Sequence, residues 1–446
     1  MSRSMGSRMR RDGTGGAIPM RMGRRAAGLI LGMILLLAGC GVGAGPGAEG
    51  PAPATASDPP PEADYWIYVG SESADRLQRV RFGPAGIEVE RSTVVGRLPT
   101  EVEGPHGVVV SPDARYVYLT TGHGVPDGHF WKFEVGPDSL VAEPILLGRF
   151  PATMDLTSDG LYAFVVNFNL YGSMIPSTMS VVYTPDVVEV AQIEMCTMPH
   201  GVRAHPGGIH VYSVCMMDDQ LVEVDTHTFR VSRRFSVDVG NEGPLPADVV
   251  AMEHGEDRVA GMDHGAHGGH GDHSAPGGDP EGASPMTGAM ERARHHASCS
   301  PTWAVPSPDG SRVWVACNVA DQILEVDVAD WSLVRRFATG RGPYNLEPTP
   351  DGRLLVATLK QGNAVEFFDT ATGESLAVTP TSTTVVHGVT ISPDSRYAFV
   401  SVEGVGSEPG KVDVFDLGSF RMVASVAVGQ QAAGIDFLRM EPSSPR

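Results

Sequence analysis

The stretch Gly104-Pro105-His106-Gly107-Val108-Val109-Val110-Ser111-Pro112-Asp113 precedes Arg115-Tyr116-Val117-Tyr118-Leu119. Ser-Pro-Asp is tight-turn chemistry, and the apolar runs on either side of it are typical of two short β-strands. With the Asp as a register point, the residue seven positions before it, here called the mark residue, can be compared along the chain. The mark residues are His106, Ala152, Thr302, Tyr344 and His387. His200 takes the same place before Pro206-Gly207, with Gly207 at the Asp position, and Ala433 does so in a truncated final copy, which makes seven marks.

The spacing of these marks predicts the fold. Successive marks lie 46, 48, 102, 42, 43 and 46 residues apart. A period of about 40 to 50 residues, with four short strands in each unit, is typical of a propeller blade. The long step is one ordinary repeat plus an insertion at about residues 241–298. The sequence therefore predicts an all-β, seven-bladed β-propeller with four antiparallel strands per blade.

The two ends of the chain predict how the ring closes. The first complete unit gives four expected strands, at 108–111, 116–120, 130–135 and 142–147. The start of the domain supplies only the outer three, at 65–70, 77–82 and 87–95, and the end supplies only an innermost one, at 433–437. One C-terminal strand should therefore join three N-terminal strands, which removes an open sheet edge.

The repeat resembles the YVTN-type seven-bladed propeller family. The resemblance rests on Pro105 to Asp113, on Ser307-Pro308-Asp309-Gly310 with Arg312-Val313-Trp314-Val315, and on Glu325-Val326-Asp327. It implies the propeller fold over the domain 63–446. It does not select a function, because the family includes binding scaffolds, lactonase-like enzymes and metal- or haem-bearing oxidoreductase domains.

The N-terminus predicts export. Arg21, Arg24 and Arg25 precede an apolar run at 26–38 that is too short to span a bilayer comfortably. The run ends in Leu37-Ala38-Gly39-Cys40, which resembles the bacterial lipobox and implies lipidation of Cys40. We therefore expect a signal peptide at 1–39, a Gly/Pro/Ala linker at 40–62, and a lipid anchor to a bacterial membrane, facing the periplasm or the cell surface.

The net charge of the chain limits the classes of molecule that it can bind. The chain has 53 acidic and 33 basic residues, a formal net charge of −20. Such a chain repels phosphate backbones, so nucleic acid is excluded as a partner. A protein partner on a propeller face stays possible.

Four cysteines remain beyond Cys40. Cys196 and Cys299 precede innermost strands, and Cys215 and Cys317 end the second strand of the same units, at spacings of 19 and 18 residues. A hairpin brings such ends together, and an exported protein can form disulfides. We predict Cys196–Cys215 and Cys299–Cys317. The alternative is soft-metal ligation by Cys196, Met198, His200 and Cys215.

The insertion is rich in metal-ligating groups on a glycine-rich backbone. It holds seven of the fifteen histidines of the chain. The candidate ligands are His254, Met262, Asp263, His264, His267, His270, His273, His295 and His296. Imidazole and thioether groups favour copper, and zinc is the main competitor. The alternative is a disordered spacer that keeps the protein soluble.

A second group of candidates lies at the predicted mouth of the channel. Topology directs the mark residues His106, His200, His387 and Tyr344 to one region, with Thr302 beside them. Loops between the second and third strands add His123, His129, Met216, Met217, Asp218 and Lys360. These side chains could be metal ligands or acid/base groups. Alternatively, the histidines only cap innermost strands by donating to loop carbonyls.

Three functions follow from these features. The first is a lipid-anchored propeller that binds copper or zinc through the insertion. The second is an enzyme, either an oxidoreductase or a lactone hydrolase, with a histidine-lined channel site. The third is a protein-interaction scaffold. The sequence contains no G-x-S-x-G, H-E-x-x-H or C-x-x-C-H motif that would decide between them.

Overall fold

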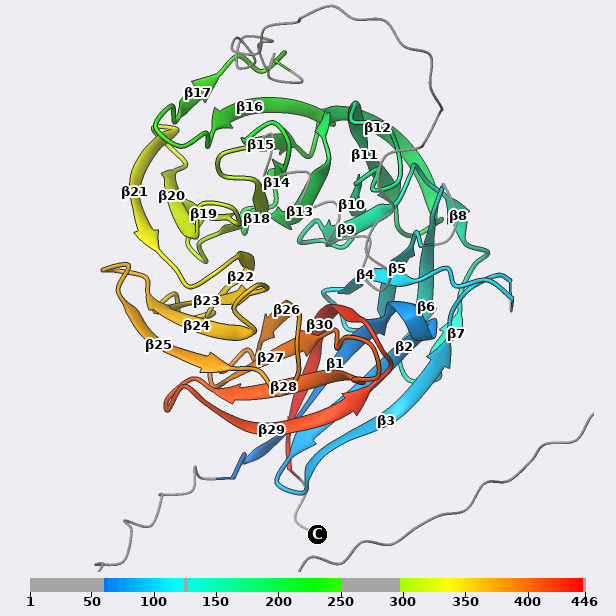
Figure 1. Cartoon of the computed structure of the whole chain (residues 1–446). Helices are drawn as coiled ribbons and strands as arrows, with labels where there is room; N and C mark the ends of the chain where they lie inside the picture. The colour runs from blue at the N-terminus through cyan, green and yellow to red at the C-terminus, as the bar shows by residue number, and fades with distance from the viewer. Residues whose placement is uncertain (1–59, 99, 124–126, 250–296, 444–446) are drawn as a thin grey trace, which may run out of the picture. The chain divides into compact units, whose positions relative to one another are not determined.

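The computed structural model describes residues 60–98, 100–123, 127–249 and 297–443. Seven antiparallel sheets stand around a central channel (Figure 1). Apart from one 3-10 turn, η1 (Glu72–Ala74), the regular structure of these residues is all β. The predicted all-β, seven-bladed propeller with four antiparallel strands per blade is confirmed. No helix in the described ranges is long and apolar enough to cross a membrane.

Each blade runs outward from an innermost strand at the channel. Blade 1 comprises β4 (Pro105–Val110), β5 (Tyr116–Thr121), β6 (His129–Glu134), β7 (Ser139–Leu140) and β8 (Ile145–Leu146). Blade 2 comprises β9 (Pro151–Leu156), β10 (Tyr162–Asn167), β11 (Pro176–Tyr183) and β12 (Val188–Thr197). Blade 3 comprises β13 (Pro199–Ala204), β14 (His210–Cys215), β15 (Gln220–Asp225), β16 (Arg230–Ser236) and β17 (Gly243–Leu245).

The remaining blades keep the four-strand pattern. Blade 4 comprises β18 (Pro301–Pro306), β19 (Arg312–Cys317), β20 (Gln322–Asp327) and β21 (Ser332–Ala338). Blade 5 comprises β22 (Pro343–Pro348), β23 (Leu354–Leu359), β24 (Ala364–Asp369) and β25 (Ser375–Pro380). Blade 6 comprises β26 (Val386–Ile391), β27 (Tyr397–Val402), β28 (Gly410–Asp416) and β29 (Arg421–Val428).

Blade 7 closes the ring as predicted. It comprises β30 (Ala432–Pro442), β1 (Ala63–Ser71), β2 (Arg76–Gly83) and β3 (Gly86–Val94), in the sheet order β3-β2-β1-β30. β30 pairs antiparallel with β1 from Ala63↔Pro442 to Ser71↔Ala432. Tyr65 of β1 packs edge-on against Tyr397 of blade 6, with ring centroids 5.1 Å apart, so apolar contacts between blades complete the closure.

Two expectations about strands need correction. The outer strand of blade 1, expected as one piece at 142–147, is divided into β7 and β8, and Pro144, which has no N–H to donate to a ladder, precedes β8. In blade 3, residues assigned to the insertion form β17, a fifth strand paired with β16.

The turns that gave the repeat its register are closed by side chains. Ser111 Oγ donates to Asp113 Oδ1 at 2.6 Å, and the same hydroxyl accepts from the backbone N–H of Tyr116 at 2.9 Å. Ser or Thr pairs with Asp in the same way in blades 2, 4, 5 and 6. The Asp therefore shapes the turn between the two inner strands of five blades.

A β-bulge lies at the mark residue in every blade. The residue before each mark pairs with the last residue of the second strand, as Pro105 does with Thr121. The register then shifts by one residue in all seven blades. Two positions before the mark, the backbone is left-handed in every blade, at Gly104, Phe150, Met198, Ser300, Gly342, Val385 and Gln431, with φ between 45° and 67°. A bulge re-aims the adjacent side chain, here toward the channel.

Both predicted disulfides are present. Cys299–Cys317 joins the residues before β18 to the end of β19 within blade 4, with Cα atoms 4.5 Å apart. Cys196 lies in β12 and Cys215 ends β14, so Cys196–Cys215 connects blade 2 to blade 3, with Cα atoms 5.9 Å apart. Because these cysteines are bonded, the alternative of soft-metal ligation by Cys196 and Cys215 is wrong.

Removing the blade 4 disulfide should weaken the fold. We expect Cys299→Ala/Cys317→Ala to lower the free energy of unfolding by about 3 kcal/mol, because the denatured chain regains the entropy of the closed loop. Urea denaturation measures this, with Cys196→Ala/Cys215→Ala as the comparison. Peptide mapping of the non-reduced wild-type protein must find both pairs, and free thiols at Cys299 and Cys317 would contradict the prediction.

Candidate functional site

Four of the predicted mark residues meet inside the channel. The ring of His387 lies 5.2 Å from His106 and 4.8 Å from Tyr344, and that of Tyr344 lies 5.5 Å from His200, all between centroids. These side chains are at most 2 % exposed. The sequence predicted that they lie at the channel mouth, but they are buried below it. Phe150 packs on His106, and Phe168 packs on His200.

A chain of hydrogen bonds fixes the proton positions on two of these histidines. His200 Nδ1 lies 2.7 Å from the carbonyl oxygen of Thr302, so Nδ1 carries the proton and Nε2 is left as an acceptor. Tyr344 Oη lies 3.2 Å from His200 Nε2 and therefore donates to it. Tyr344 Oη lies equally far from His387 Nε2, which must donate in turn. His387 Nδ1 then carries no proton, and its lone pair has no hydrogen-bond partner among the described residues. His200 therefore does donate to a carbonyl, and through Tyr344 this bond also fixes which nitrogen of His387 carries the proton.

A carboxylate fixes the third histidine. His106 Nδ1 lies 2.6 Å from Glu72 Oε1. Although burial alone raises the pKa of Glu72, His123 and His106 hold it well below its usual value, so the carboxylate is ionised and accepts. His106 therefore carries its proton on Nδ1 and presents Nε2 as a second lone pair.

The sequence candidate His123 lies behind Glu72. Its Nε2 contacts Glu72 Oε2, and its Nδ1 lies 2.8 Å from the hydroxyl oxygen of Tyr171, which is half exposed. Burial lowers the pKa of His123, but the Glu72 carboxylate outweighs that effect and raises it above the usual value. His123 thus positions Glu72 and connects it to the surface loop that carries Tyr171.

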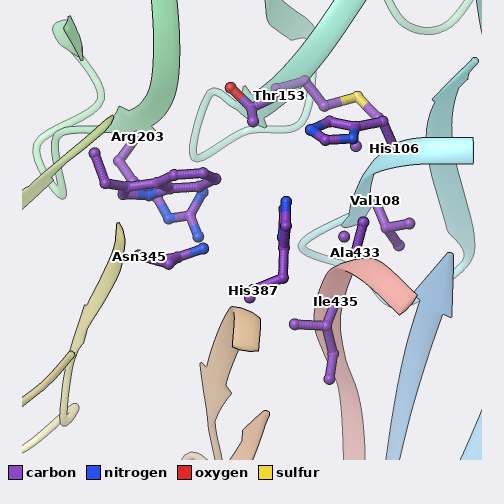
Figure 2. A pocket seen from close by; sticks show the side chains of 13 residues that line it. His106, Val108, Thr153, Arg203, Asn345, His387, Ala433 and Ile435 are labelled. Atoms are coloured by element: carbon purple, nitrogen blue, oxygen red, sulfur yellow. The ribbon is translucent and has the colours of Figure 1, made fainter. Parts of the chain in front are cut away.

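A small cavity lies beside the two lone pairs. It has a volume of about 30 Å³, enough for one or two water molecules, within about 330 Å³ of unfilled space that includes its open end. Figure 2 shows His106 and His387 reaching it from two sides, with Arg203 and Asn345 across from His106. Five lining polar atoms are buried and have no hydrogen-bond partner among the described residues: His106 Nε2, His387 Nδ1, Thr153 Oγ1, Trp303 Nε1 and Asn345 Oδ1.

The same groups could hold a metal ion. One ligand atom each from Glu72, His106 and His387 lie within 4.8 Å of one another, and all three residues are buried. Two imidazoles and a carboxylate suit zinc, and the imidazoles also suit copper. The lone pairs of His106 Nε2 and His387 Nδ1 are available for such a bond.

A buried ion pair borders the cluster. Lys360 Nζ lies 2.7 Å from Glu403 Oε1 and 4.2 Å from the centre of the Tyr344 ring. Burial first, and then the charges of Glu403 and Glu72, raise the pKa of Tyr344 well above its usual value, so the phenol stays protonated. The hydrogen-bond chain through Tyr344 is therefore stable at neutral pH.

Other sequence candidates lie elsewhere. His129 begins β6, and its Nε2 lies 3.0 Å from Arg97 Nη1. Met216 and Met217 pack in an apolar cluster, and Asp218 accepts a hydrogen bond from the backbone N–H of Thr197 at 2.6 Å. Cys40 and the insertion ligands from His254 to His296 lie outside the described residues.

Glu72 and Glu403 were missed because they lie in connections without a motif. The signal was positional: Glu72, Lys360 and Glu403 each follow the last residue of the second strand, which the register pairs with the residue before the mark. This position, compared between blades, indicates Glu72 and Glu403 together with Lys360, which the sequence analysis already names.

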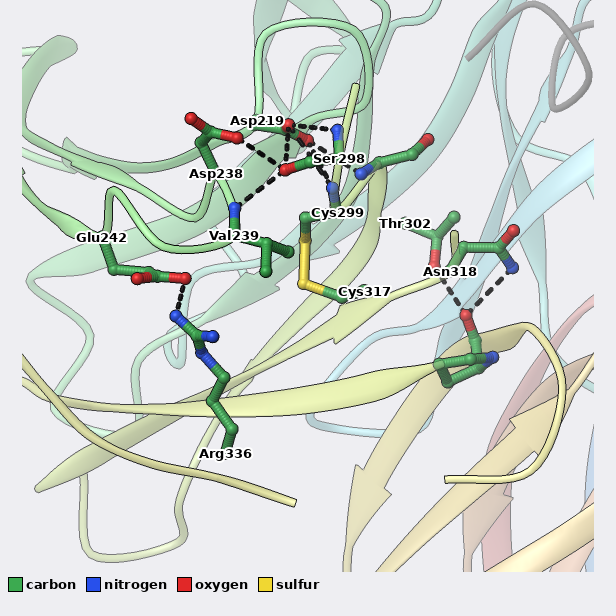
Figure 3. Close-up of a disulfide and its surroundings, with 12 residues drawn as sticks. Asp219, Asp238, Val239, Glu242, Ser298, Cys299, Thr302, Cys317, Asn318 and Arg336 are labelled. Atoms are coloured by element: carbon green, nitrogen blue, oxygen red, sulfur yellow. Dashed lines mark hydrogen bonds and ion pairs between the residues drawn. A yellow bond between two sulfur atoms is a disulfide. The ribbon is translucent and has the colours of Figure 1, made fainter. Parts of the chain in front are cut away.

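The two ends of the insertion are firmly attached to blades 3 and 4 (Figure 3). Asp219 accepts from the backbone N–H of Ser298 at 2.7 Å and from that of Ser300 at 2.8 Å. The Cys299–Cys317 disulfide lies between these residues, and Glu242 pairs with Arg336 on the other side. The insertion therefore enters and leaves the propeller through fixed points.

No family model and no curated protein matches the sequence. Among solved structures, the chain is similar to a putative 6-phosphogluconolactonase from Bacteroides fragilis, with a TM-score of 0.57, 13 % identity, and coverage of 84 % of this chain and 98 % of that one. It is also similar to a periplasmic gluconolactonase from Pseudomonas aeruginosa, with a TM-score of 0.58, 15 % identity, and coverage of 84 % and 99 %. The third is a protein from Lactobacillus plantarum, with a TM-score of 0.59, 12 % identity, and coverage of 84 % and 100 %. At this identity the similarity establishes the fold, a seven-bladed propeller like those of 6-phosphogluconolactonase-like proteins.

The buried neutral histidines should make stability depend on pH. Burial, opposed by the hydrogen bond to Thr302, lowers the pKa of His200 to about 3. In the unfolded chain His200 titrates near 6.5, so only the unfolded state gains a proton as pH falls below that value. The contribution to stability is present above pH 6.5 and is lost toward pH 3, amounting to about 2 kcal/mol at pH 5.

Urea denaturation at pH 7.5 and pH 5.0 measures this loss. We expect His200→Gln to remove about 2 kcal/mol of the difference between the two pH values. The exposed His227 gives the matched control, His227→Gln, which should leave the difference unchanged. An identical pH dependence in wild type and His200→Gln would contradict the prediction.

Proposed function

We propose that the protein is an exported propeller hydrolase that opens a lactone or a related ester inside its channel. The observation that carries the proposal is that five residues lining one cavity have a buried polar atom without a partner, two of them imidazole nitrogens, His106 Nε2 and His387 Nδ1. The fold shared with two solved proteins that bear lactonase names is compatible with it.

The proposed nucleophile is a water molecule in the cavity. A water has two O–H donors, and the two lone pairs are the acceptors that would orient it. His106 is the general base, because Glu72 holds the Nδ1–H and stabilises the imidazolium that forms when Nε2 takes the proton. His387 orients the water, since burial, together with the charges of Lys360 and His106, holds its pKa well below the usual value.

The other side of the cavity supplies a donor for the substrate. Attack of the water oxygen on the ester carbon moves the carbonyl electron pair onto oxygen, and the unpartnered Trp303 Nε1–H can stabilise that charge. When the bond from carbon to the ring oxygen breaks, the proton held on His106 passes to that oxygen. The products are a free acid and an alcohol, and the base is restored.

Substitution of the general base His106, and of Glu72, which accepts its Nδ1–H, tests the proposal. With a panel of sugar and aliphatic lactones in a pH-stat assay, we expect His106→Gln to lower kcat by about 10²- to 10⁴-fold, the usual contribution of a general base. Glu72→Gln should lower kcat at least about tenfold through loss of the correct tautomer. His210→Gln, which changes a histidine of β14 outside the channel, is the control.

The proposal fails if wild type hydrolyses no member of the panel above the rate in buffer. It also fails if His106→Gln retains wild-type kcat.

A divalent transition metal in the channel is the second candidate function for the same site. Its support is the convergence of Glu72, His106 and His387 within 4.8 Å. Zinc is favoured by this donor set, and copper is next. A bound metal would supply a Lewis acid for the same hydrolysis.

Export, lipid anchoring and metal capture by the insertion are further parts of the proposal. The two disulfides support a location outside the cytoplasm, where such bonds persist. We propose that Cys40 carries the lipid and that the insertion binds copper or zinc in addition to the channel activity. Membership of the YVTN-type family is proposed on the same repeat motifs.

Elemental analysis separates the two metal sites. For mature protein loaded with copper or zinc, we expect deletion of residues 251–296 to remove most of the bound metal and leave the melting temperature nearly unchanged, because the ends are held by Asp219 and Cys299. Metal lost instead with His106→Ala/His387→Ala would place it in the channel. Unchanged stoichiometry after the deletion would refute capture by the insertion.

A further inference from the structure

A second ring of side chains lies three residues beyond the marks, on the same innermost strands. It is formed by Val109, Asp155, Arg203, Val305, Glu347, Thr390 and Asp436. Four members are ionisable and come from blades 2, 3, 5 and 7. They interact across the channel: Asp155 and Asp436 both act on Glu347, and Arg203 acts on all three carboxylates.

Arg203 places this ring beside the cavity, on the more exposed side of the mark residues. The side chains of Arg203 and Glu347 are 21 % and 25 % exposed, whereas the mark residues His106 and His387 are at most 2 % exposed. Arg203 also lines the cavity, together with Trp303. Among the described residues, the partly exposed ring thus lies between solvent on that side and the buried histidines, which makes it the entrance we consider.

The only cation of the ring is already engaged. Arg203 Nε and Nη2 lie 3.5 Å from Glu347 Oε2, and the guanidinium lies 5.0 Å from the Trp303 ring. Asp155 and Asp436 are held in place, because each accepts a backbone N–H of the next blade at 2.7 Å, from Ala204 and Val110. Three fixed carboxylates thus surround one guanidinium, which leaves excess negative charge at the entrance.

Burial, partly offset by Arg203 but reinforced by the neighbouring carboxylates, raises the pKa of Glu347 to about 7. Burial likewise raises the pKa of Asp436 to about 6. The negative charge of the ring is therefore largest above pH 7.

We propose that the ring of Asp155, Arg203, Glu347 and Asp436 selects the substrate by charge, admitting lactones or esters without an anionic group and rejecting phosphorylated ones. This inference rests on the proposed hydrolase function. A phosphate monoester carries a charge of about −1.5 to −2 at pH 7 and would meet like charges in a narrow, partly desolvated entrance. No unengaged cation of the ring offsets that repulsion. The substrate class is thus an uncharged or cationic lactone or ester.

The test compares two lactones that differ only in the phosphate, glucono-δ-lactone and its 6-phosphate, at pH 8. We expect wild-type kcat/KM to favour the neutral lactone by at least about 30-fold. Asp155→Asn/Glu347→Gln/Asp436→Asn removes three charges and keeps one oxygen acceptor at each Asn for the backbone N–H of the next blade, from Ala204 and Val110. It should reduce the discrimination at least about tenfold, through faster turnover of the phosphorylated lactone.

A matched variant removes three exposed carboxylates instead, Glu143→Gln/Asp330→Asn/Glu374→Gln, and should discriminate as wild type does. Equal or faster hydrolysis of the phosphorylated lactone by wild type overturns the inference. Unchanged discrimination in the channel variant also overturns it.

A second measurement does not depend on turnover and separates this inference from the hydrolase proposal. Trp303 lines the cavity, so its fluorescence, taken as the difference between wild type and Trp303→Phe, reports entry into the channel. Neutral acrylamide should quench this component and iodide should not, while the channel variant should become sensitive to iodide. If neither lactone is hydrolysed but this pattern is found, the hydrolase proposal fails and charge selection stands. Equal quenching by both agents, or by neither, overturns charge selection.

Discussion

The pairing register between the two inner strands of each blade is the constraint on which the site depends. In blade 1 Pro105 pairs with Thr121, and in blade 6 Val386 pairs with Val402, with a one-residue bulge directly after each. A strand without the bulge would point alternate residues at the channel in a fixed period of two. The bulge shifts that period by one residue, so the mark residue and the residue three positions later both face the channel. Two layers of different chemistry, imidazoles and then carboxylates, result from one repeated irregularity.

Buried polar atoms inside the channel lower the stability of the fold when they have no hydrogen-bond partner. A buried polar atom without a partner costs about 1 to 3 kcal/mol, and a folded domain is stable by only about 5 to 15 kcal/mol. If no water or ligand bonded to them, five such atoms around one cavity would offset most of the free energy that stabilises the fold. By contrast, the atoms that only position others are satisfied: His200 has Thr302, Tyr344 has two histidines, and Glu72 has His106 and His123. The contrast separates the supporting groups from the groups that need a water, a substrate or an ion.

The sequence predicted the fold because the repeat carries its own register. Ser-Pro-Asp turns placed the marks, the marks gave the blade count, and the unequal ends gave the closing strand. It also predicted both disulfides, because each pair has nearly the same spacing around a mark residue, although Cys196 lies in the outer strand of blade 2 and Cys299 lies next to its own blade. It could not predict that His106 would be buried, since packing by Phe150 involves a different blade. It missed Glu72, because only the equivalence of its position to those of Lys360 and Glu403 in other blades, and no motif around β1, indicates a residue at the channel. Side-chain contacts across the channel are set by the closed ring, not by neighbours in sequence.

The residues that directly follow the insertion are fixed to the propeller, and they lie close to the channel site along the chain. Only a few residues lie between the insertion and Thr302, whose carbonyl oxygen fixes the tautomer of His200 and, through Tyr344, that of His387. A movement transmitted along this stretch would disturb the site. Asp219 holds three successive backbone N–H groups here, at Ser298, Cys299 and Ser300, and Cys299 is bonded to the end of β19. The backbone from Ser298 to Ser300 is therefore held in place just before it reaches Thr302. Cys299 and Cys317 also belong to the apolar cluster through which blades 3 and 4 pack on each other, so the disulfide joins the fixed backbone before Thr302 to the core between these blades.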